Sequence, residues 1–215
     1  TLLLASGSIT INPSIYKRMP FDTKKDLMPI TNVASAAMLV VVPYGSPVKT
    51  IKDLIALAKA EPGAINFGSA GIGSQVHMAG EHLADAADID ITHVPYNGEA
   101  PAYTDLIANR VQMMVGNFTA ASALLGKGSL RALAVTGKQR SPQLPDVPTV
   151  AESGLPDFEN TGWFGLFAPA GTPPAVVAKV QRDVAKMLGE TEIKAQLYKL
   201  GMTPVGNTPG DFERE

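Results

Sequence analysis

The sequence predicts an α/β fold in which most of the strands run parallel. Two observations lead to this expectation. Short apolar runs that are typical of strands alternate along the chain with segments whose apolar residues recur at helical spacing. Turns of glycine, proline and asparagine separate these segments, and no internal repeat or low-complexity tract interrupts their order. Alternation of this kind is typical of units that build parallel sheets.

The first predicted elements are a strand at 1–5 and a short helix opened by Asn12 and Pro13, with a polar turn at 6–8 between them. The run Thr-Leu-Leu-Leu-Ala predicts a buried strand, and a buried parallel strand needs neighbours on both sides. We therefore expect the natural protein to have a further N-terminal part. After a loop at 20–26, a second apolar strand is predicted at 38–42.

The middle of the chain repeats the order strand, turn, helix. Thr50 and Asp53 have capping-box spacing at the start of one helix, and Ser74 is a good N-cap for the next. A third helix begins at Glu99, with a proline in its first turn, where helices tolerate it. The predicted strands of this part are 65–67, 91–94, 111–115 and 130–135.

The last part has a different character. A proline-rich segment at 141–156 precedes an aromatic and apolar stretch at 163–168, a long helix with an apolar face, and a last helix that closes at Gly201. The segments 141–156 and 29–37 are candidate points at which the chain passes between two lobes. Crossovers of this kind can act as hinges that close on a ligand.

Composition excludes several classes of function. The 215 residues are 45% hydrophobic and 18% charged, carry a net charge of −2, and include no cysteine. Thiol catalysis and thiolate metal sites are thereby excluded, and nucleic acid is not expected as a partner because no clustered positive face exists. No stretch approaches the length needed to span a bilayer, so we expect no direct membrane insertion. Neither a basic start nor a cleavage site follows Thr1, so no signal peptide is predicted in this sequence.

The segment from Ala64 to His77 carries the clearest functional signal. A short apolar strand runs into Gly68-Ser-Ala-Gly-Ile-Gly73, and a helix follows at once. This order places backbone N–H groups and hydroxyls at a helix N-terminus, where the helix dipole favours an anion. The loop contains no lysine or arginine, so we expect it to hold a small carboxylate by hydrogen bonds. The alternative is a tight turn that binds nothing.

Nucleotide motifs do not fit this loop. Gly68 and Gly73 have Walker spacing, but Ser74 and Gln75 stand where lysine and serine or threonine are required, and Val76 replaces the third glycine of the dinucleotide motif. A second loop, Pro95-Tyr-Asn-Gly-Glu-Ala-Pro101, also links a strand end to a helix start. Because ligands bind outside the carboxyl ends of strands in open α/β sheets, the two loops together favour one carboxylate site.

Metal and catalytic interpretations are also weak. His77 and Glu81 share a helix face, but His82 lies about 140° away around the helix, so no metal site is predicted and His77 is expected to pack or brace the loop. No nucleophile elbow is present, and His93 lies in a predicted strand without an acidic partner, so we predict no catalytic residue. Trp163 could equally belong to the core or to the wall of a cleft.

Together these motifs resemble those of the Bug, or TctC, family, the substrate-binding proteins of tripartite tricarboxylate transporters. The resemblance covers nearly the whole chain and rests on six runs in the family's order. These are Gly-Ser-Ala-Gly-Ile-Gly-Ser-Gln-Val-His-Met-Ala-Gly-Glu at 68–81, Val-Pro-Tyr-Asn-Gly-Glu-Ala-Pro-Ala at 94–102, Leu-Arg-Ala-Leu-Ala-Val-Thr at 130–136, Arg-Ser at 140–141, Leu-Pro-Asp-Val-Pro-Thr-Val-Ala-Glu-Ser-Gly at 144–154 and Trp-Phe-Gly-Leu-Phe-Ala-Pro-Ala-Gly-Thr-Pro at 163–173.

The resemblance implies a two-lobed periplasmic-binding-protein fold of type II, the Venus flytrap, with the N-terminal part of the first lobe missing. The implied outer lobe is 1–38 with 153–215, and the implied inserted lobe is 39–152. Residues implied to bind the ligand carboxylate are those of the two loops, Ser69, Gly71, Ser74, Gln75 and the amide of Ala100. Weaker assignments are Ser6 and Ser8 at the end of the outer-lobe strand, and Asn117 for the distal part of the ligand.

The function that the resemblance implies is capture of a small carboxylate or related organic acid in the periplasm, for delivery to the membrane components of a tripartite tricarboxylate transporter. No cofactor, no metal and no chemical step are implied. A ligand-sensing domain of the same fold in a regulator is the alternative, and an enzyme on this fold is a third possibility.

Overall fold

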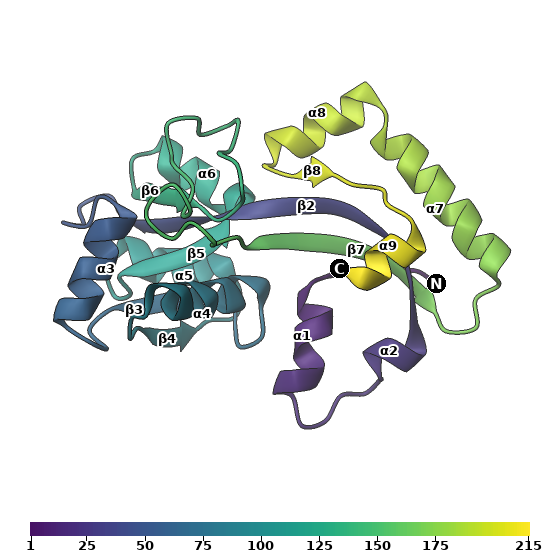
Figure 1. Ribbon diagram of the computed structural model, residues 1–215, viewed down its shortest axis with the longest axis horizontal. Helices are drawn as coiled ribbons and strands as arrows, with labels where there is room; N and C mark the ends of the chain where they lie inside the picture. The colour runs from purple at the N-terminus through teal and green to yellow at the C-terminus, as the bar shows by residue number, and fades with distance from the viewer. The chain divides into compact units, whose positions relative to one another are not determined.

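The computed structural model describes residues 1–215, which form two compact units. The flanking unit combines Thr1–Ala36 with Gly162–Glu215, and the central unit is Ala37–Thr161 (Figure 1). The proline-rich segment 141–156 belongs to the central unit, because the N–H of Val150 donates to the carbonyl of Val135 and Phe158 is buried in the core of that unit. The division into two ligand-binding lobes, 1–38 with 153–215 and 39–152, stays a prediction.

The central unit contains a five-stranded sheet in the order β6-β2-β5-β3-β4. Strands β3 (Asn66–Ser69), β4 (Thr92–Pro95) and β5 (Met113–Asn117) pair in parallel. Strand β2 (Leu27–Pro43) runs antiparallel to β5 and to β6 (Leu130–Val135). The expected α/β fold with mostly parallel strands is therefore confirmed for this unit, with β2 as the exception.

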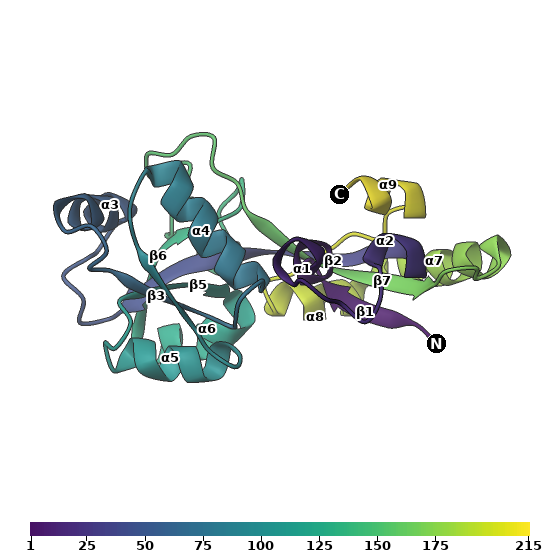
Figure 2. The same cartoon turned by 90° about the horizontal axis from the view of Figure 1, so that it is seen from below.

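Helices cover both faces of this sheet (Figure 2). Helices α3 (Ile51–Ala60) and α4 (Gln75–Ala87) lie on one face, and α5 (Glu99–Ile107) and α6 (Phe118–Gly126) lie on the other. Because side chains alternate along a strand, β2 supplies both cores. Met38, Val40 and Val42 pack with α3 and α4, whereas Leu39 and Val41 pack with α5 and α6.

Local signals start α3 and α4 as predicted. The Thr50 hydroxyl accepts the N–H of Asp53, and the Asp53 carboxylate accepts the N–H of Thr50, which completes a capping box at α3. Ser74 caps α4 by accepting the N–H of His77. Such caps satisfy amide groups that have no acceptor inside the helix.

Helix α4 comes very close to β3 at Gly80. A Cβ at this position would lie 2.4 Å from Cε2 of Phe67, which is fully buried in β3. Only glycine therefore allows this helix to pack at its observed distance from the sheet. Because α4 starts at the glycine-rich loop, the same packing positions that loop.

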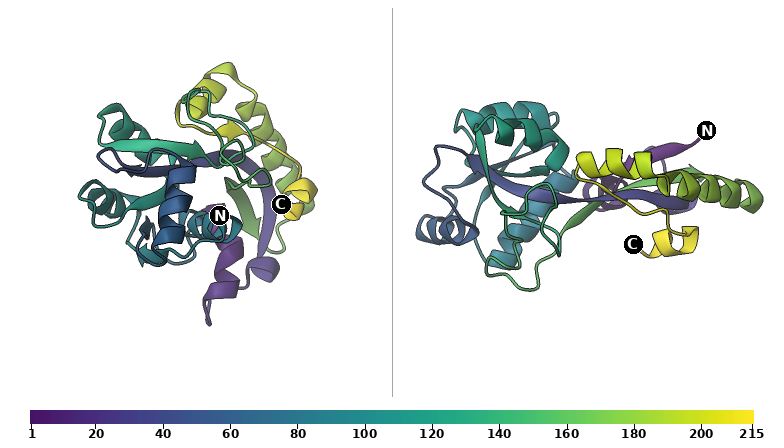
Figure 3. Two further views of the ribbon diagram at one scale, coloured as in Figure 1. Left: turned by 60° about the vertical axis from the view of Figure 1, so that its left-hand side comes forward. Right: turned by 90° about the horizontal axis from the view of Figure 1, so that it is seen from above.

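The flanking unit is built on antiparallel pairs. Strand β1 (Leu3–Ser6) pairs with β7 (Thr161–Pro169), β7 neighbours β2, and β8 (Thr203–Pro204) pairs with β2. The helices of this unit are α1 (Ser8–Ile15), α2 (Thr23–Asp26), α7 (Pro174–Leu188), α8 (Thr191–Lys199) and α9 (Pro209–Arg214). Helices α7 and α8, yellow-green in Figure 3, follow one another near the C-terminal end.

The first strand is exposed in this structure, so the neighbours that the sequence prediction calls for are not among residues 1–215. Leu2 and Leu4 are 49% and 62% exposed, and β1 pairs antiparallel with β7 alone. An apolar run indicates that burial would be favourable, but only neighbouring elements produce it. The strand predicted at 38–42 is also too short, because β2 begins at Leu27 and takes in the stretch 29–37. That stretch is extended chain inside a strand, with the boundary between the two units after Ala36.

Helix α1 begins at Ser8 and not at Asn12, so Pro13 lies inside it. A proline in this position cannot donate to the carbonyl four residues earlier, which is that of Ile9. The hydroxyl of Thr23 donates to this carbonyl instead, at 3.1 Å. A tertiary contact therefore replaces the lost helical bond. The chain also continues past Gly201 with β8 and α9, which the sequence interpretation did not anticipate.

Candidate functional site

The carboxyl ends of three parallel strands lie at one edge of the central sheet. Strand β3 ends at Ser69, β4 ends at Pro95 and β5 ends at Asn117, and each is followed by the N-terminal part of a helix. Six of the predicted site residues are therefore brought to this edge within one unit: Ser69, Gly71, Ser74, Gln75, Ala100 and Asn117. In open α/β sheets, this is the edge at which ligands bind.

Ser69 lies beneath the loop and is fully buried. Its hydroxyl oxygen is 2.6 Å from Nε2 of His93 in the neighbouring strand, and it accepts the N–H of Gly71 at 3.1 Å. The Ser69 hydroxyl also donates to the carbonyl of Gly71 at 3.3 Å, so it is hydrogen-bonded both to the loop and to His93. Ser69 therefore supports the glycine-rich loop through hydrogen bonds from its buried side.

Gly71 holds the first loop against the second. Its φ is +121°, a conformation that L side chains rarely adopt, and an added Cβ would lie 3.3 Å from the carbonyl oxygen of Tyr96. The N–H of Tyr96 in turn donates to the carbonyl of Ser69 at 3.1 Å. The two loops that the sequence singled out are therefore in contact.

The start of α4 is closed by its own polar groups. The Ser74 hydroxyl donates to the carbonyl of Gly71 at 2.7 Å while it caps the helix, and Nδ1 of His77 accepts the N–H of Gly73 at 3.2 Å. The prediction that His77 braces the loop is confirmed. With the His77 N–H used by the cap, the N–H of Val76 in the first turn still has no acceptor within the helix.

His77 and His93 form a stack beneath this loop, with ring centroids 3.9 Å apart and planes 29° apart. Burial, and to a smaller extent the charge of His77, lower the pKa of His93 to about 4. His93 is therefore neutral at pH 7, and its Nε2 shares a hydrogen bond with the Ser69 hydroxyl. This neutral imidazole is part of the support of the loop.

His77, Glu81 and His93 bring their possible ligand atoms within 4.8 Å of one another. The sequence interpretation considered His82 in place of His93, but His82 stacks on Phe158. The rings of His77 and His93 are nearly parallel, and the lone pairs of imidazole lie in the ring plane, so they do not converge on one ion. Both rings also have hydrogen-bond partners in the protein. The two histidines therefore support the glycine-rich loop through hydrogen bonds.

The second loop ends at Gly98, which adopts a φ of +109° immediately before α5. Ala100, in the first turn, is exposed, and its N–H has no acceptor within the helix. Pro101 has no N–H to offer. The first turn of α5 therefore presents few amide donors, and that of Ala100 is one of them.

Glu99 makes contacts that the sequence interpretation missed. One carboxylate oxygen accepts the N–H of Asn117 at 2.9 Å, and the other accepts Nδ2 of Asn117 at 2.5 Å. The start of α5 is thereby tied to the end of β5. The predicted contact of Asn117 with the ligand stays a prediction, and in this structure both of its donors are directed to Glu99.

The remaining predicted residues lie in the flanking unit. Ser6 ends β1, Ser8 begins α1, and the hydroxyl of Ser6 donates to that of Ser8 at 3.2 Å. Trp163 packs edge-on against Phe212, with ring centroids 5.1 Å apart, and also contacts Phe167. Trp163 is therefore part of the aromatic core of its unit.

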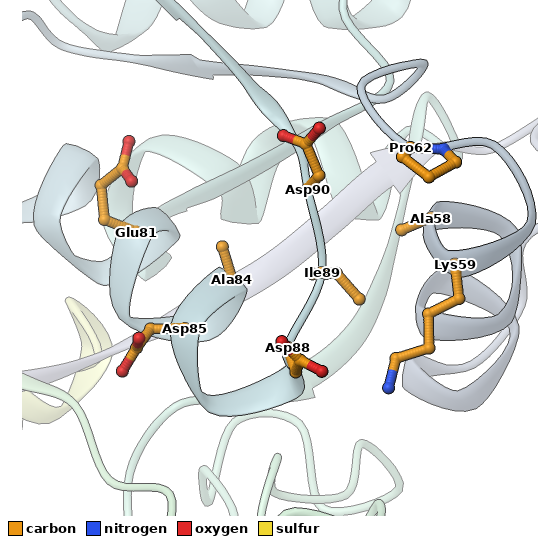
Figure 4. Close-up of a pocket in the computed structure, with 9 residues that line it drawn as sticks. All are labelled: Ala58, Lys59, Pro62, Glu81, Ala84, Asp85, Asp88, Ile89 and Asp90. Carbon is orange, nitrogen blue, oxygen red and sulfur yellow. The ribbon is translucent and has the colours of Figure 1, made fainter.

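A hollow elsewhere in the central unit carries acidic side chains. It is lined from α3, α4 and the segment that follows α4, and Figure 4 labels Lys59, Glu81, Asp85, Asp88 and Asp90 among its residues. The carboxylates of the four acidic residues point in different directions (Figure 4), so they do not form a set of ligands around one position. This hollow contains none of the predicted site residues.

Of the two missed residues, His93 and Glu99, only His93 had a signal in the sequence, and it was weak. In parallel strands, His93 pairs with Phe67 and Pro95 with Ser69, so the alternation of side chains places His93 on the face of Phe67 and Ser69. That inference requires knowing that β3 and β4 are neighbours. Glu99 had no comparable signal, because its contact depends on how α5 and β5 pack.

Comparison with known proteins identifies clear relatives. The family described as "Tripartite tricarboxylate transporter family receptor" matches residues 1–214. The protein BugT of Bordetella pertussis is 33% identical over 211 residues, which are 97% of this chain and 65% of BugT. The chain therefore spans less than two thirds of the length of this curated relative.

Two solved structures resemble the chain closely. A structure named as R. palustris Rpa4515 with adipate has a TM-score of 0.93 and 34% identity, and the likeness covers 100% of this chain and 72% of that one. MatC of Rhodopseudomonas palustris, solved with bound malate, has a TM-score of 0.83 and 28% identity, with coverage of 95% and 70%. None of the helices described here is long and apolar enough to cross a membrane.

Proposed function

Because the chain belongs to the family of tripartite tricarboxylate transporter receptors, whose α/β periplasmic-binding-protein fold it has, we propose that it binds a small organic acid for such a transporter. The protein captures the acid in the periplasm and delivers it to the membrane components of the transporter, and it carries out no chemical step. Relatives of known structure were solved with adipate and with malate, both of which are carboxylates.

The observation that carries this proposal is the shared edge of the central sheet. The glycine-rich loop and the second loop touch through Gly71 and Tyr96, and the helices α4 and α5 begin there. First-turn amides of two helices can hold one carboxylate by charge-assisted hydrogen bonds, each worth on the order of 1.5–3 kcal/mol. No lysine or arginine occurs between Gly68 and Ala108, so the amides and polar side chains bind the anion.

Within this site we propose different roles for the predicted residues. The amides of the α4 and α5 first turns, including that of Ala100, and the side chain of Gln75 contact the carboxylate. Ser69 and Ser74 set the shape of the loop through the hydrogen bonds described above. Gly71 allows the close contact of the two loops. Asn117, Ser6 and Ser8 remain candidates for the rest of the ligand.

Calorimetric titration of the full-length protein tests the proposal. The panel consists of short monocarboxylic and dicarboxylic acids, amino acids and nicotinate. We expect at least one carboxylate to bind, and Gly71→Ala to weaken its binding at least tenfold, because alanine is strained at this φ and meets the Tyr96 carbonyl. Gly45→Ala is the matched control, since nothing lies within 4 Å of its added Cβ.

Two outcomes would contradict the proposal. If no acid of the panel binds, the proposed class of ligand is wrong. If Gly71→Ala folds normally and binds the acid as tightly as Gly45→Ala does, the carboxylate is held elsewhere.

A further inference from the structure

The carboxylate of Glu99 lies at the same edge as the proposed site. Glu99 is the first residue of α5, next to Ala100, and is only half-buried. Its two oxygens accept from the backbone and side-chain nitrogens of Asn117, which ends β5 immediately before α6. A negative charge of the protein therefore occupies the region between the starts of α5 and α6.

A buried hydroxyl lies beside this carboxylate. Tyr103 is 3% exposed, and Glu99 is the polar group that faces its hydroxyl, although the two do not meet strict hydrogen-bond geometry. A Cβ on Gly116 would be 2.0 Å from this hydroxyl and 3.2 Å from an oxygen of Glu99, so both groups share the space over Gly116. Burial, and then the Glu99 charge, raise the pKa of Tyr103, which keeps the phenol neutral.

Glu99 is in none of the ion pairs within 4.0 Å that the structure contains. Asn117 supplies hydrogen bonds to Glu99 but no net charge. A second anion at this position would therefore meet a like charge and would find the Asn117 donors already used by Glu99.

We propose that Glu99 selects ligands that carry one carboxylate and, at the far end, a hydrogen-bond donor such as an ammonium, amide or hydroxyl group. The carboxylate binds at the glycine-rich loop, and the donor faces the Glu99 oxygens. A second carboxylate in place of the donor is rejected. This inference rests on the proposed function and deepens it, and it separates this chain from relatives that were solved with adipate and malate.

The test uses matched acids of equal chain length with the full-length protein. Each set contains an ω-amino acid, an ω-hydroxy acid and a dicarboxylic acid of three to six carbons, and affinity is measured by calorimetry. For the wild-type protein we expect the best donor-bearing acid to bind at least tenfold more tightly than the dicarboxylic acid of its length. Glu99→Gln removes the charge but keeps an acceptor oxygen for Asn117, and we expect it to reduce this preference to less than threefold.

Glu61→Gln is the matched control, because Glu61 is an exposed carboxylate before β3, at the opposite end of the sheet from the site. This variant should keep the wild-type preference, and thermal unfolding of both variants should show intact folds. The inference is overturned, and the proposed function stands, if dicarboxylic acids bind the wild-type protein as tightly as donor-bearing acids do. If none of these acids binds wild type or Glu99→Gln, the inference fails, and the wider panel of acids decides separately whether the proposed function fails with it.

Discussion

Replacement of Gly80 by alanine sets two known effects against each other. Alanine in the interior of a helix is favoured over glycine by about 0.5–1 kcal/mol. At Gly80, however, the added Cβ would lie 2.4 Å and 2.8 Å from two carbons of the Phe67 ring. Such overpacking of a core costs about 1–3 kcal/mol.

The steric effect should win, because the Phe67 ring has no room to move. Phe67 is fully buried, and the His93 ring lies on it with the centroids 4.9 Å apart. We therefore expect Gly80→Ala to lower the free energy of unfolding by about 1–2 kcal/mol. The start of α4 should shift with the helix, so that binding at the glycine-rich loop weakens as well.

Urea unfolding followed by circular dichroism measures the change, with Gly126→Ala as the matched control. Gly126 is also a helical glycine, at the end of α6, but nothing lies within 4 Å of its added Cβ. The free energy of unfolding of the control should be unchanged or higher by about a few tenths of a kcal/mol. If Gly80→Ala is as stable as Gly126→Ala, the argument that glycine sets the distance between α4 and the sheet is wrong.

Three further predictions concern single positions. The pKa of His93 is about 4 in the folded protein, whereas unfolded histidine titrates near 6.5, so the unfolded state gains the proton first as pH falls. Between pH 7.5 and 5, the free energy of unfolding of wild type should therefore fall by about 1 kcal/mol more than that of His93→Phe, a value that allows for the partial exposure of His93. Equal losses in the two proteins would contradict the lowered pKa of His93. Thr50→Ala removes the cap of α3 and should cost about 1 kcal/mol in a thermal or urea melt, whereas no change would mean that the capping box contributes nothing. Gly116→Ala places a Cβ 2.0 Å from the Tyr103 hydroxyl and should cost about 1–3 kcal/mol. The same substitution in a Tyr103→Phe background should cost clearly less, and an equal cost would show that the hydroxyl is not the obstacle.

Prediction from the sequence succeeded where a local signal determines the structure. The Thr50 box and the Ser74 cap each lie within four residues, and both occur as expected. The limits of strand β6 also match the predicted range 130–135. The family and its fold could be predicted because the motifs of the two loops stand in a characteristic order along nearly the whole chain.

Prediction failed where contacts between distant segments decide the outcome. Nothing local indicates that Thr23 takes over the carbonyl that Pro13 leaves without a donor, so the start of α1 was misplaced. The support of Ser69 by His93 depends on which strands are neighbours. The contact between Glu99 and Asn117 joins residues eighteen positions apart on two elements. The sheet edge at which the two loops meet was thus predictable, but the hydrogen bonds that organise it were not.

The lack of lysine and arginine in the two loops has a consequence for the rate at which a ligand is captured. Dipoles of backbone amides act over a few ångströms, whereas a net charge attracts an anion over a Debye length, about 8 Å at physiological ionic strength. A protein with a net charge of −2 also gives an anion no overall attraction. Association should therefore proceed without electrostatic steering, and its rate constant should change little when salt is added. A site of this kind would work equally well in dilute and in salty surroundings, because its selectivity arises only after contact.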